Sequence, residues 1–169
     1  MTVTQLNRAD REAFTDAVGF AFEHSPWIAE AAWERRPFES VDDLHARMVA
    51  IVEQAPAERQ IALISAHPDL AGRVAREGRL TPASQGEQGS AGLDALTPDE
   101  IARFESLNGA YRTRFGFPFV ICARENTKDS ILAELETRTR NAPETEIEKA
   151  LQELAEIARL RLHDAVQDG

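Results

Sequence analysis

The chain has 169 residues, of which 43% are hydrophobic and 28% charged, and its formal net charge is −10. These values are ordinary for a folded globular protein and exclude an extensively disordered chain. The negative charge argues against a general affinity for nucleic acid or anionic membranes. The length suits one compact domain over residues 1–169, because a second independent core would be small.

The sequence contains no feature of an exported or membrane-anchored protein. Its longest apolar run, at 117–123, is far too short to cross a bilayer, and the first twenty residues lack the basic and hydrophobic regions of an export signal. Cys122 is the sole cysteine, so no intramolecular disulfide can form, which fits a reducing compartment. We therefore expect a cytoplasmic protein that binds no membrane.

The hydrophobic pattern of the first half of the chain is typical of short amphipathic helices. Each begins at a residue that caps helices or fits their first turn, and the expected starts are Asn7, Ser25, Ser40 and Pro56. The first helix is expected to end near His24 and the fourth at His67. The second is broken by the proline-containing segment at 35–40.

The stretch at 67–88 gathers the least ordinary chemistry of the chain. His67 stands directly before Pro68, and proline fits the first position of a helix, so the pair predicts a helix start with His67 as its N-cap. Thr81 and Pro82 repeat the arrangement, and the helix after them carries on one face Ser84, Glu87 and Gln88. Two helix starts with these side chains and partial positive charge from their dipoles predict a polar pocket.

The second half is expected to contain a long helix, an extended segment and two further helices. Thr97 and Pro98 start the long helix, Gly109 within it is expected to mark close packing, and Gly116 ends it. Residues 117–123 must be extended, because proline as their second residue disfavours helix before it. No similar run is available to pair with this segment. We expect it to cross the core, where its backbone groups need partners and could serve a ligand.

The last two helices are expected at about 128–140 and after 141–143. Arg161 falls within the apolar arc of the final helix, so its charge needs an anionic partner. The whole pattern predicts an all-α fold, a single compact domain with roughly seven to nine helices and one extended crossing segment.

Each polar residue of interest also has a structural interpretation. His67 can be a helix cap, and Glu87 and Gln88 can be ordinary first-turn residues that satisfy the helix dipole. Ser84 alone indicates neither a functional nor a structural role. Arg161 can belong to a structural ion pair as readily as to a substrate site.

Several familiar chemistries lack support in the sequence. The histidines lie on separate segments without a helical pair, so no metal site is predicted, and no phosphate loop or dinucleotide fingerprint is present. Cys122 lies in an apolar run and is expected in the core rather than as a nucleophile. The only lysines, Lys128 and Lys149, are expected at a loop edge and on a solvated face, which argues against Schiff-base chemistry.

Several motifs stand along the chain in a distinctive order: SPW at 25–27, AHPDLAG at 66–72, SQGEQ at 84–88, AGLD at 91–94, LNGAYRTRFGFPFVICARE at 107–125 and LRL at 160–162. Together they resemble the 2-oxo-4-hydroxy-4-carboxy-5-ureidoimidazoline (OHCU) decarboxylase family of purine catabolism. The resemblance runs nearly end to end, and the order of HPDLA, the spaced EQ and FGFPFVICA is far more specific than any one of them.

The resemblance implies an all-α homodimer that uses no cofactor and converts OHCU, a product of urate oxidation, into (S)-allantoin. It implies His67 as the catalytic histidine and Glu87 as its acidic partner. The implied substrate contacts are Pro68, Ser84, Gln85, Gly86, Glu87, Gln88, the backbone of Phe119, Val120, Ile121, Cys122 and Ala123, and Arg161.

Two other functions stay open at this point. One is a non-enzymatic helical interaction module, in which His67, Glu87 and Arg161 are only caps and ion pairs. The other is a hydrolase of a related ureido compound, against which the lack of a predicted metal site and of an obvious nucleophile counts. Convergence of the three residues around one pocket would favour the enzyme.

Overall fold

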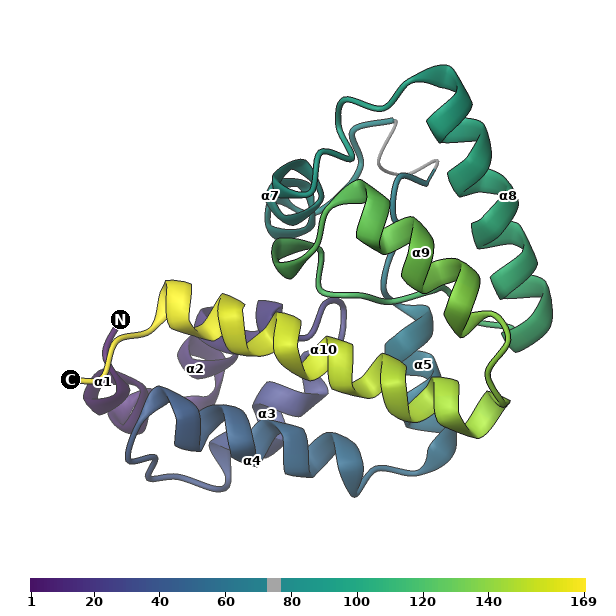
Figure 1. Cartoon of the computed structure of the whole chain (residues 1–169). Helices are drawn as coiled ribbons and strands as arrows, with labels where there is room; N and C mark the ends of the chain where they lie inside the picture. Colours follow the sequence, from purple (N-terminus) through teal and green to yellow (C-terminus); the bar gives the residue numbers. More distant parts are fainter. Residues whose placement is uncertain (73–76) are drawn as a thin grey trace. The chain divides into compact units, whose positions relative to one another are not determined.

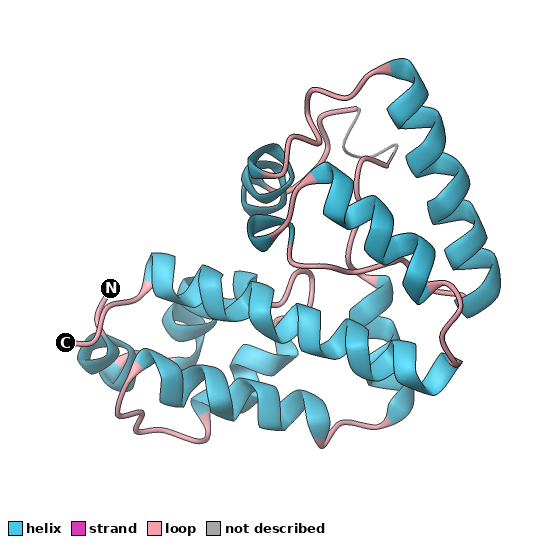
Figure 2. Cartoon of the chain, in the orientation of Figure 1, coloured by secondary structure: helices cyan, strands magenta, loops and turns pink. Residues whose placement is uncertain are grey.

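A computed structural model describes residues 1–72 and 77–169 (Figure 1). In this described part every regular element is a helix, and none is a strand (Figure 2). The predicted all-α class is therefore confirmed. Residues 1–66 and 154–169 form one compact unit, and residues 67–153 form a second. A single domain over 1–169 stays a prediction.

The first unit is built mainly from short helices, with α3 packed against both α2 and α4. The side chains of Phe14, Ile28, Leu44 and Met48 are fully buried in its core. The two chain ends lie together beside α1, where Val3 donates to the Gln167 carbonyl at 3.0 Å (Figure 1). The elements are α1 (Val3–Arg8), α2 (Arg11–Val18), η1 (Gly19–Ala21), α3 (Trp27–Trp33), α4 (Val41–Glu53), α5 (Ala57–Ser65) and the end of α10 (Pro143–Ala165).

The prediction that Asn7 caps the first long helix is wrong. Thr2 caps α1 and Asp10 caps α2, each by accepting a backbone N–H with its side chain. Asn7 lies in the last turn of α1, where its amide instead binds both backbone groups of Phe38, at 2.8 Å each. The helix also ends at Val18 rather than near His24, because a 3₁₀ turn follows it.

The later predicted starts in this unit agree with the structure. α3 begins after the Ser25-Pro26 pair. The Ser40 hydroxyl accepts from the Asp43 N–H at 3.0 Å to cap α4, and Pro56 directly precedes α5.

The described residues of the second unit form four longer helical elements and one 3₁₀ turn, with α8 packed on α9 and α7 packed on η2. Thr97 caps α8 and Gly116 ends it in the left-handed conformation, with φ +80°, as predicted. Gly109 is exposed, and a Cβ there would meet nothing within 4 Å, so the expected close packing is wrong. The elements are α7 (Pro82–Ser90), α8 (Pro98–Phe115), η2 (Ala123–Glu125), α9 (Lys128–Arg138) and the start of α10.

The prediction of a helix start at Pro68 is also wrong for the described residues. Residues 67–72 form turns, with Gly72 donating to the Asp69 carbonyl at 3.3 Å, and Ala71 has φ +51°. A left-handed residue cannot continue a helix, so His67 is no N-cap here. The predicted helix would continue through 73–76, which lie outside the described residues. No helix in the described part is long and apolar enough to span a bilayer.

Candidate active site

Helix α7 carries the predicted site residues Ser84, Gln85, Gly86, Glu87 and Gln88. Its start is fixed by Thr81, whose hydroxyl accepts from the Ser84 N–H at 3.3 Å, with Pro82 in the first turn. Ser84 and Gln88 are buried, Glu87 is half-buried at the edge of the same face, and the neighbours Gln85 and Gly86 are exposed. The helix thus turns a hydroxyl, a carboxylate and an amide away from bulk solvent.

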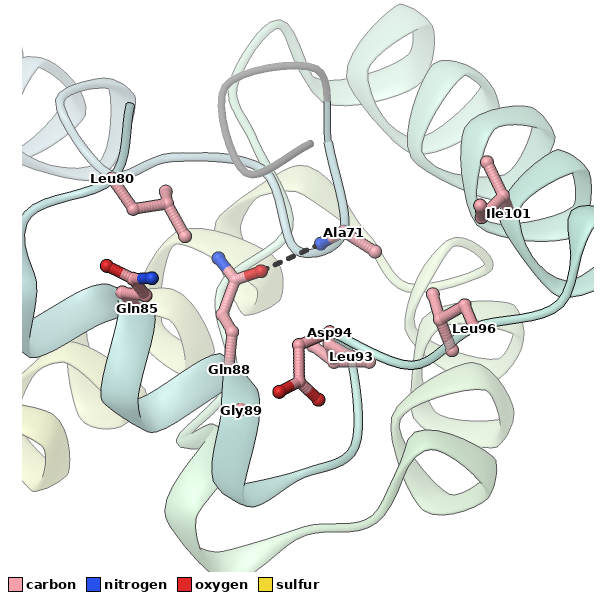
Figure 3. Close-up of a pocket in the computed structure, with 9 residues that line it drawn as sticks. All are labelled: Ala71, Leu80, Gln85, Gln88, Gly89, Leu93, Asp94, Leu96 and Ile101. Carbon is pink, nitrogen blue, oxygen red and sulfur yellow. Dashed lines mark hydrogen bonds between the residues drawn. The ribbon is translucent and has the colours of Figure 1, made fainter. Parts of the chain in front are cut away.

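The loop that begins at His67 is joined to this helix. The Ala71 N–H donates to Oε1 of Gln88 at 3.0 Å, a buried hydrogen bond drawn in Figure 3. His67 itself is only 8% exposed, so its imidazole is largely shielded from bulk solvent. The two segments that the sequence singled out, HPDLAG and SQGEQ, therefore lie in contact.

A cavity of 320 Å³ lies beside α7, on the side of Gln85, Gln88 and Gly89 (Figure 3). Leu93 and Ile101 are among its apolar walls. Neither His67 nor Glu87 is among its described lining residues. The predicted glutamines Gln85 and Gln88 therefore line this cavity, whereas the two predicted catalytic residues are not among its described walls.

The crossing segment is buried over Phe119–Ala123, and it is extended as predicted until η2 begins. Side chains satisfy part of its backbone: the Cys122 N–H donates to Glu153 at 2.8 Å, and the Cys122 carbonyl accepts from Asn126 at 2.9 Å. Because α7 packs on η2, the Ala123 end of the segment lies close to the helix that bears Glu87.

Cys122 is not suited to nucleophilic catalysis near neutral pH. Burial, and next the negative charge of Glu125, raises the pKa of the Cys122 thiol to about 11. The thiolate is the reactive form, so the expectation of a core cysteine agrees with its setting. In the described part of the chain no group of three His, Cys, Asp or Glu residues is placed to hold a metal ion.

A buried cluster of charged side chains contacts the crossing segment and was not predicted from the sequence. Arg138 and Glu146 form an ion pair at 3.0 Å, with side chains 3% and 0% exposed. Arg138 also donates to the Val120 carbonyl at 2.8 Å and stacks 4.4 Å from the centre of the Phe119 ring. A signal did exist, since Arg138 continues the three-four spacing of the buried Ile131 and Leu135.

The hydroxyl of Tyr111 donates to Glu146 in the same cluster, and Asn141 donates to this carboxylate at 2.9 Å. Burial, followed by the contact with Glu146, raises the pKa of Tyr111 well above its usual value. The Glu146 carboxylate therefore accepts from a guanidinium, a phenol and an amide. Such complete pairing is what a buried charge requires.

Arg161 belongs to the first unit, where it is buried as the helical pattern predicted. Its guanidinium binds Glu23 at 3.2 Å and donates to the Phe20 carbonyl at 3.1 Å, and the side chains of Arg161 and Glu23 are 3% and 5% exposed. The predicted anionic partner is thus Glu23, which follows the end of a helix and had no recognisable signal in the sequence. Convergence of Arg161 with His67 and Glu87 stays a prediction.

Comparisons with known proteins agree with this arrangement of motifs. A family model described as OHCU decarboxylase matches residues 7–163. The chain is 46% identical to a 2-oxo-4-hydroxy-4-carboxy-5-ureidoimidazoline decarboxylase of Haloferax volcanii, covering 96% of this chain and 94% of that protein. It is 42% identical to the protein of the same name from Halalkalicoccus jeotgali, covering 97% and 91%.

A solved structure of (S)-allantoin synthase is similar in fold, with a TM-score of 0.80 and 33% identity. It covers 99% of this chain, which spans only 54% of that longer chain. The family match and the two relatives each extend over most of the sequence. The chain belongs to the OHCU decarboxylase family.

Proposed function

We propose that this protein decarboxylates OHCU to (S)-allantoin, the step of urate breakdown for which its family is named. The family match spans both compact units, and the two archaeal relatives are matched over 94% and 91% of their length. The observation in the structure that carries the proposal is the Ala71–Gln88 hydrogen bond. It joins the loop that bears His67 to the helix that bears Glu87.

The reaction asks for binding and proton transfer more than for a cofactor. The bond between the ring carbon and the carboxylate carbon breaks, CO2 leaves, and the electron pair passes into the adjacent C=N bond of the ring. The ring nitrogen takes up a proton, and a second proton then adds to the ring carbon that bears the ureido group while the hydroxyl loses its proton to become the ring carbonyl. The substrate supplies the electron sink that cofactors provide in many decarboxylases, so we propose that no cofactor is needed.

In this proposal His67 handles the proton and Glu87 is its acidic partner. His67 is shielded from bulk water, which favours transfer of the proton to one face of the bound intermediate. Delivery to one face would set the (S) configuration. The remaining substrate contacts are Pro68, Ser84, Gln85, Gly86, Gln88 and the backbone of Phe119, Val120, Ile121, Cys122 and Ala123.

Arg161 enters the proposal on the family resemblance, as a contact for the anionic substrate. Its buried partner Glu23 already compensates its charge, which equally suits a structural role. Arg161→Met separates the two. A substrate contact predicts a raised KM for OHCU in the folded variant, whereas a lower melting temperature with an unchanged KM would assign Arg161 to the fold.

We also propose that the chain acts as one domain, as a homodimer and in the cytoplasm, all from the family resemblance and the sequence. Light scattering over a concentration series should give about twice the chain mass of 18.7 kDa. A fully active monomer would remove the dimer from the proposal.

The direct test is to add the protein to freshly generated OHCU and follow the ultraviolet decay and the optical rotation of the product. His67→Gln should melt within a few degrees of the parent protein and lose about 100-fold or more of the catalysed rate, because Gln cannot exchange a proton near neutral pH. His163→Gln, which changes an exposed histidine of the first unit, should keep the parent rate. A folded His67→Gln protein with parental rate and optical purity would refute the assignment.

A further inference from the structure

The loop of residues 67–72 depends on neighbouring helices for its position. In the described part of the chain, its backbone forms no helix or strand whose hydrogen bonds would hold it in place. His67 is its first residue. Side chains from α7 and α8 hold three consecutive residues: Asp69 by Arg112 at 2.9 Å, Leu70 by Asn108 at 2.9 Å and Ala71 by Gln88 at 3.0 Å.

Two of these contacts act on a single peptide group. The carbonyl of Leu70 accepts from Nδ2 of Asn108, and the N–H of Ala71 donates to Oε1 of Gln88. Because these atoms belong to the same planar peptide bond, its plane is held from both sides. Asn108 and Gln88 are 9% and 5% exposed, so water competes little for either bond. We call this arrangement of Asn108 and Gln88 the carboxamide clamp.

The third contact, the ion pair of Arg112 with Asp69, is weakened by its exposure to water. The side chains of Arg112 and Asp69 are 48% and 32% exposed, and ion pairs this accessible to water contribute little. Of these three contacts, the two of the carboxamide clamp therefore constrain the loop most.

The clamp holds a backbone conformation that an alanine does not favour. Ala71 has φ +51°, and a non-glycine residue stays in the left-handed region only where its surroundings determine it. The orientation of the Leu70–Ala71 peptide plane is set together with this φ. Release of one end of the plane would let Ala71 relax, and the fixed φ of Pro68 leaves one torsion fewer to absorb the movement before His67.

Asn108 is poorly explained by stability alone. It lies on the buried face of α8 between Phe104 and Tyr111, where an apolar side chain would pack without polar atoms. Its Oδ1 is buried and has no hydrogen-bond partner in the described part of the chain, whereas Nδ2 must face the Leu70 carbonyl, which can only accept. Its favourable polar contact is thus the one to the loop of His67.

We propose that Asn108 is a positioning residue for the decarboxylation: by clamping the Leu70–Ala71 peptide it fixes the place of the His67 imidazole. This inference rests on the proposed function. It assigns Asn108 no contact with the substrate.

The test is Asn108→Leu, which fills a similar volume without the donor, together with Asn108→Asp, which keeps the shape but presents oxygen in place of Nδ2. We expect kcat for OHCU to fall about 10- to 100-fold, the scale of a catalytic group displaced by about an ångström, with a smaller change in KM. The optical purity of the product should fall as well. Arg103→Gln, which removes an exposed ion pair from the same helix, should leave all three unchanged.

A second readout does not depend on activity. The ring signals of His67 in ¹H–¹⁵N spectra, assigned with His67→Gln, should shift in both Asn108 variants and stay in place in Arg103→Gln. Parental ring signals and kcat in either folded Asn108 variant would overturn the inference. So would a loss of activity that only follows the unfolded fraction. If the parent protein had no activity on OHCU, the proposed function would fail, and the ring signals alone would decide whether Asn108 positions His67.

Discussion

Two irregular segments of the second unit carry predicted site residues, and they are held in different ways. The loop at 67–72 is held mainly by neutral amides, those of Asn108 and Gln88. The crossing segment at 117–122 is held mainly by buried or half-buried charges, with Arg138 at the Val120 carbonyl and Glu153 at the Cys122 N–H.

Whether a segment is held by neutral amides or by charges decides whether a substitution there mainly changes catalysis or stability. Removal of one neutral amide leaves no buried charge behind, so the fold can survive while the loop moves. Removal of one member of a buried ion pair leaves the other uncompensated, so the whole unit is destabilised. Variants of the loop should therefore report on catalysis, and variants behind the crossing segment should report on stability.

Arg138→Met should have the largest effect on stability. It leaves Glu146 buried without its guanidinium, and we expect the free energy of unfolding in urea to fall by about 3 to 5 kcal/mol. Arg103→Gln breaks an exposed pair with Glu136 and should cost no more than about 1 kcal/mol.

The double variant Arg138→Met/Glu146→Leu sharpens this result. It removes both charges and should recover much of the loss, because apolar residues can replace a buried pair. Tyr111 and Asn141 would still lose an acceptor, so recovery should be incomplete. A single variant as stable as the parent would show that the cluster does not hold the segment.

Glu153→Leu should have the next largest effect on the free energy of unfolding. It leaves the buried Cys122 N–H without its acceptor, and the expected loss of stability is about 1 to 3 kcal/mol. Glu153→Gln keeps an acceptor oxygen but loses the charge that strengthens the bond, so it should cost less. Hydrogen exchange at the Cys122 amide should accelerate in the Leu variant and less in the Gln variant. Equal exchange in all three proteins would contradict the contact.

The sequence predicts best where a local rule acts without competition. Ser40, Thr97 and Gly116 each fit one helix end, and the structure places them there. Arg161 was predicted to be buried from its spacing alone, and it is. Local preference and tertiary packing agree at these positions.

Prediction fails where side chains far apart in the sequence decide the conformation. Pro68 is compatible with a first helical turn, but the clamp of Asn108 and Gln88 stabilises a left-handed Ala71 that the local rules do not favour. Asn7 fits a cap equally well, yet Phe38 binds its amide. Such partners cannot be identified before the fold is known.

Gly72→Ala should disturb the loop from its other end. A Cβ on Gly72 would lie 2.8 Å from Cβ of Asp69, closer than such atoms approach, so the turn must open. We expect a loss of about 1 to 2 kcal/mol by overpacking, together with a lower kcat as His67 moves. Gly109→Ala is the matched control, because a Cβ there meets nothing and Ala favours helix by about 0.5 to 1 kcal/mol. Parental kcat in a folded Gly72→Ala protein would mean that the loop tolerates displacement.

The smallest effect on stability near neutral pH is expected for a change at Cys122, whose thiol lies within the crossing segment. Its pKa is about 11 in the folded chain against an ordinary 9.0, so at pH 8 the thiolate fraction should be about 100-fold lower than in the unfolded chain. Alkylation by iodoacetamide should be slower in the native protein by at least this factor, because the side chain is also buried.

The same shift has a defined sign for stability. The folded state retains the proton, so the contribution of Cys122 is fully present below pH 9 and is lost as the pH rises through about 11. The variant Cys122→Ser does not titrate in this range and should show a flatter fall in the free energy of unfolding above pH 9. Tyr111, whose pKa is also raised, loses its contribution at high pH in both proteins, and only the difference between them reports on Cys122. Rapid native alkylation at pH 8, or identical pH profiles for the two proteins, would show that the crossing segment opens to solvent and is less firmly held than its charged contacts imply.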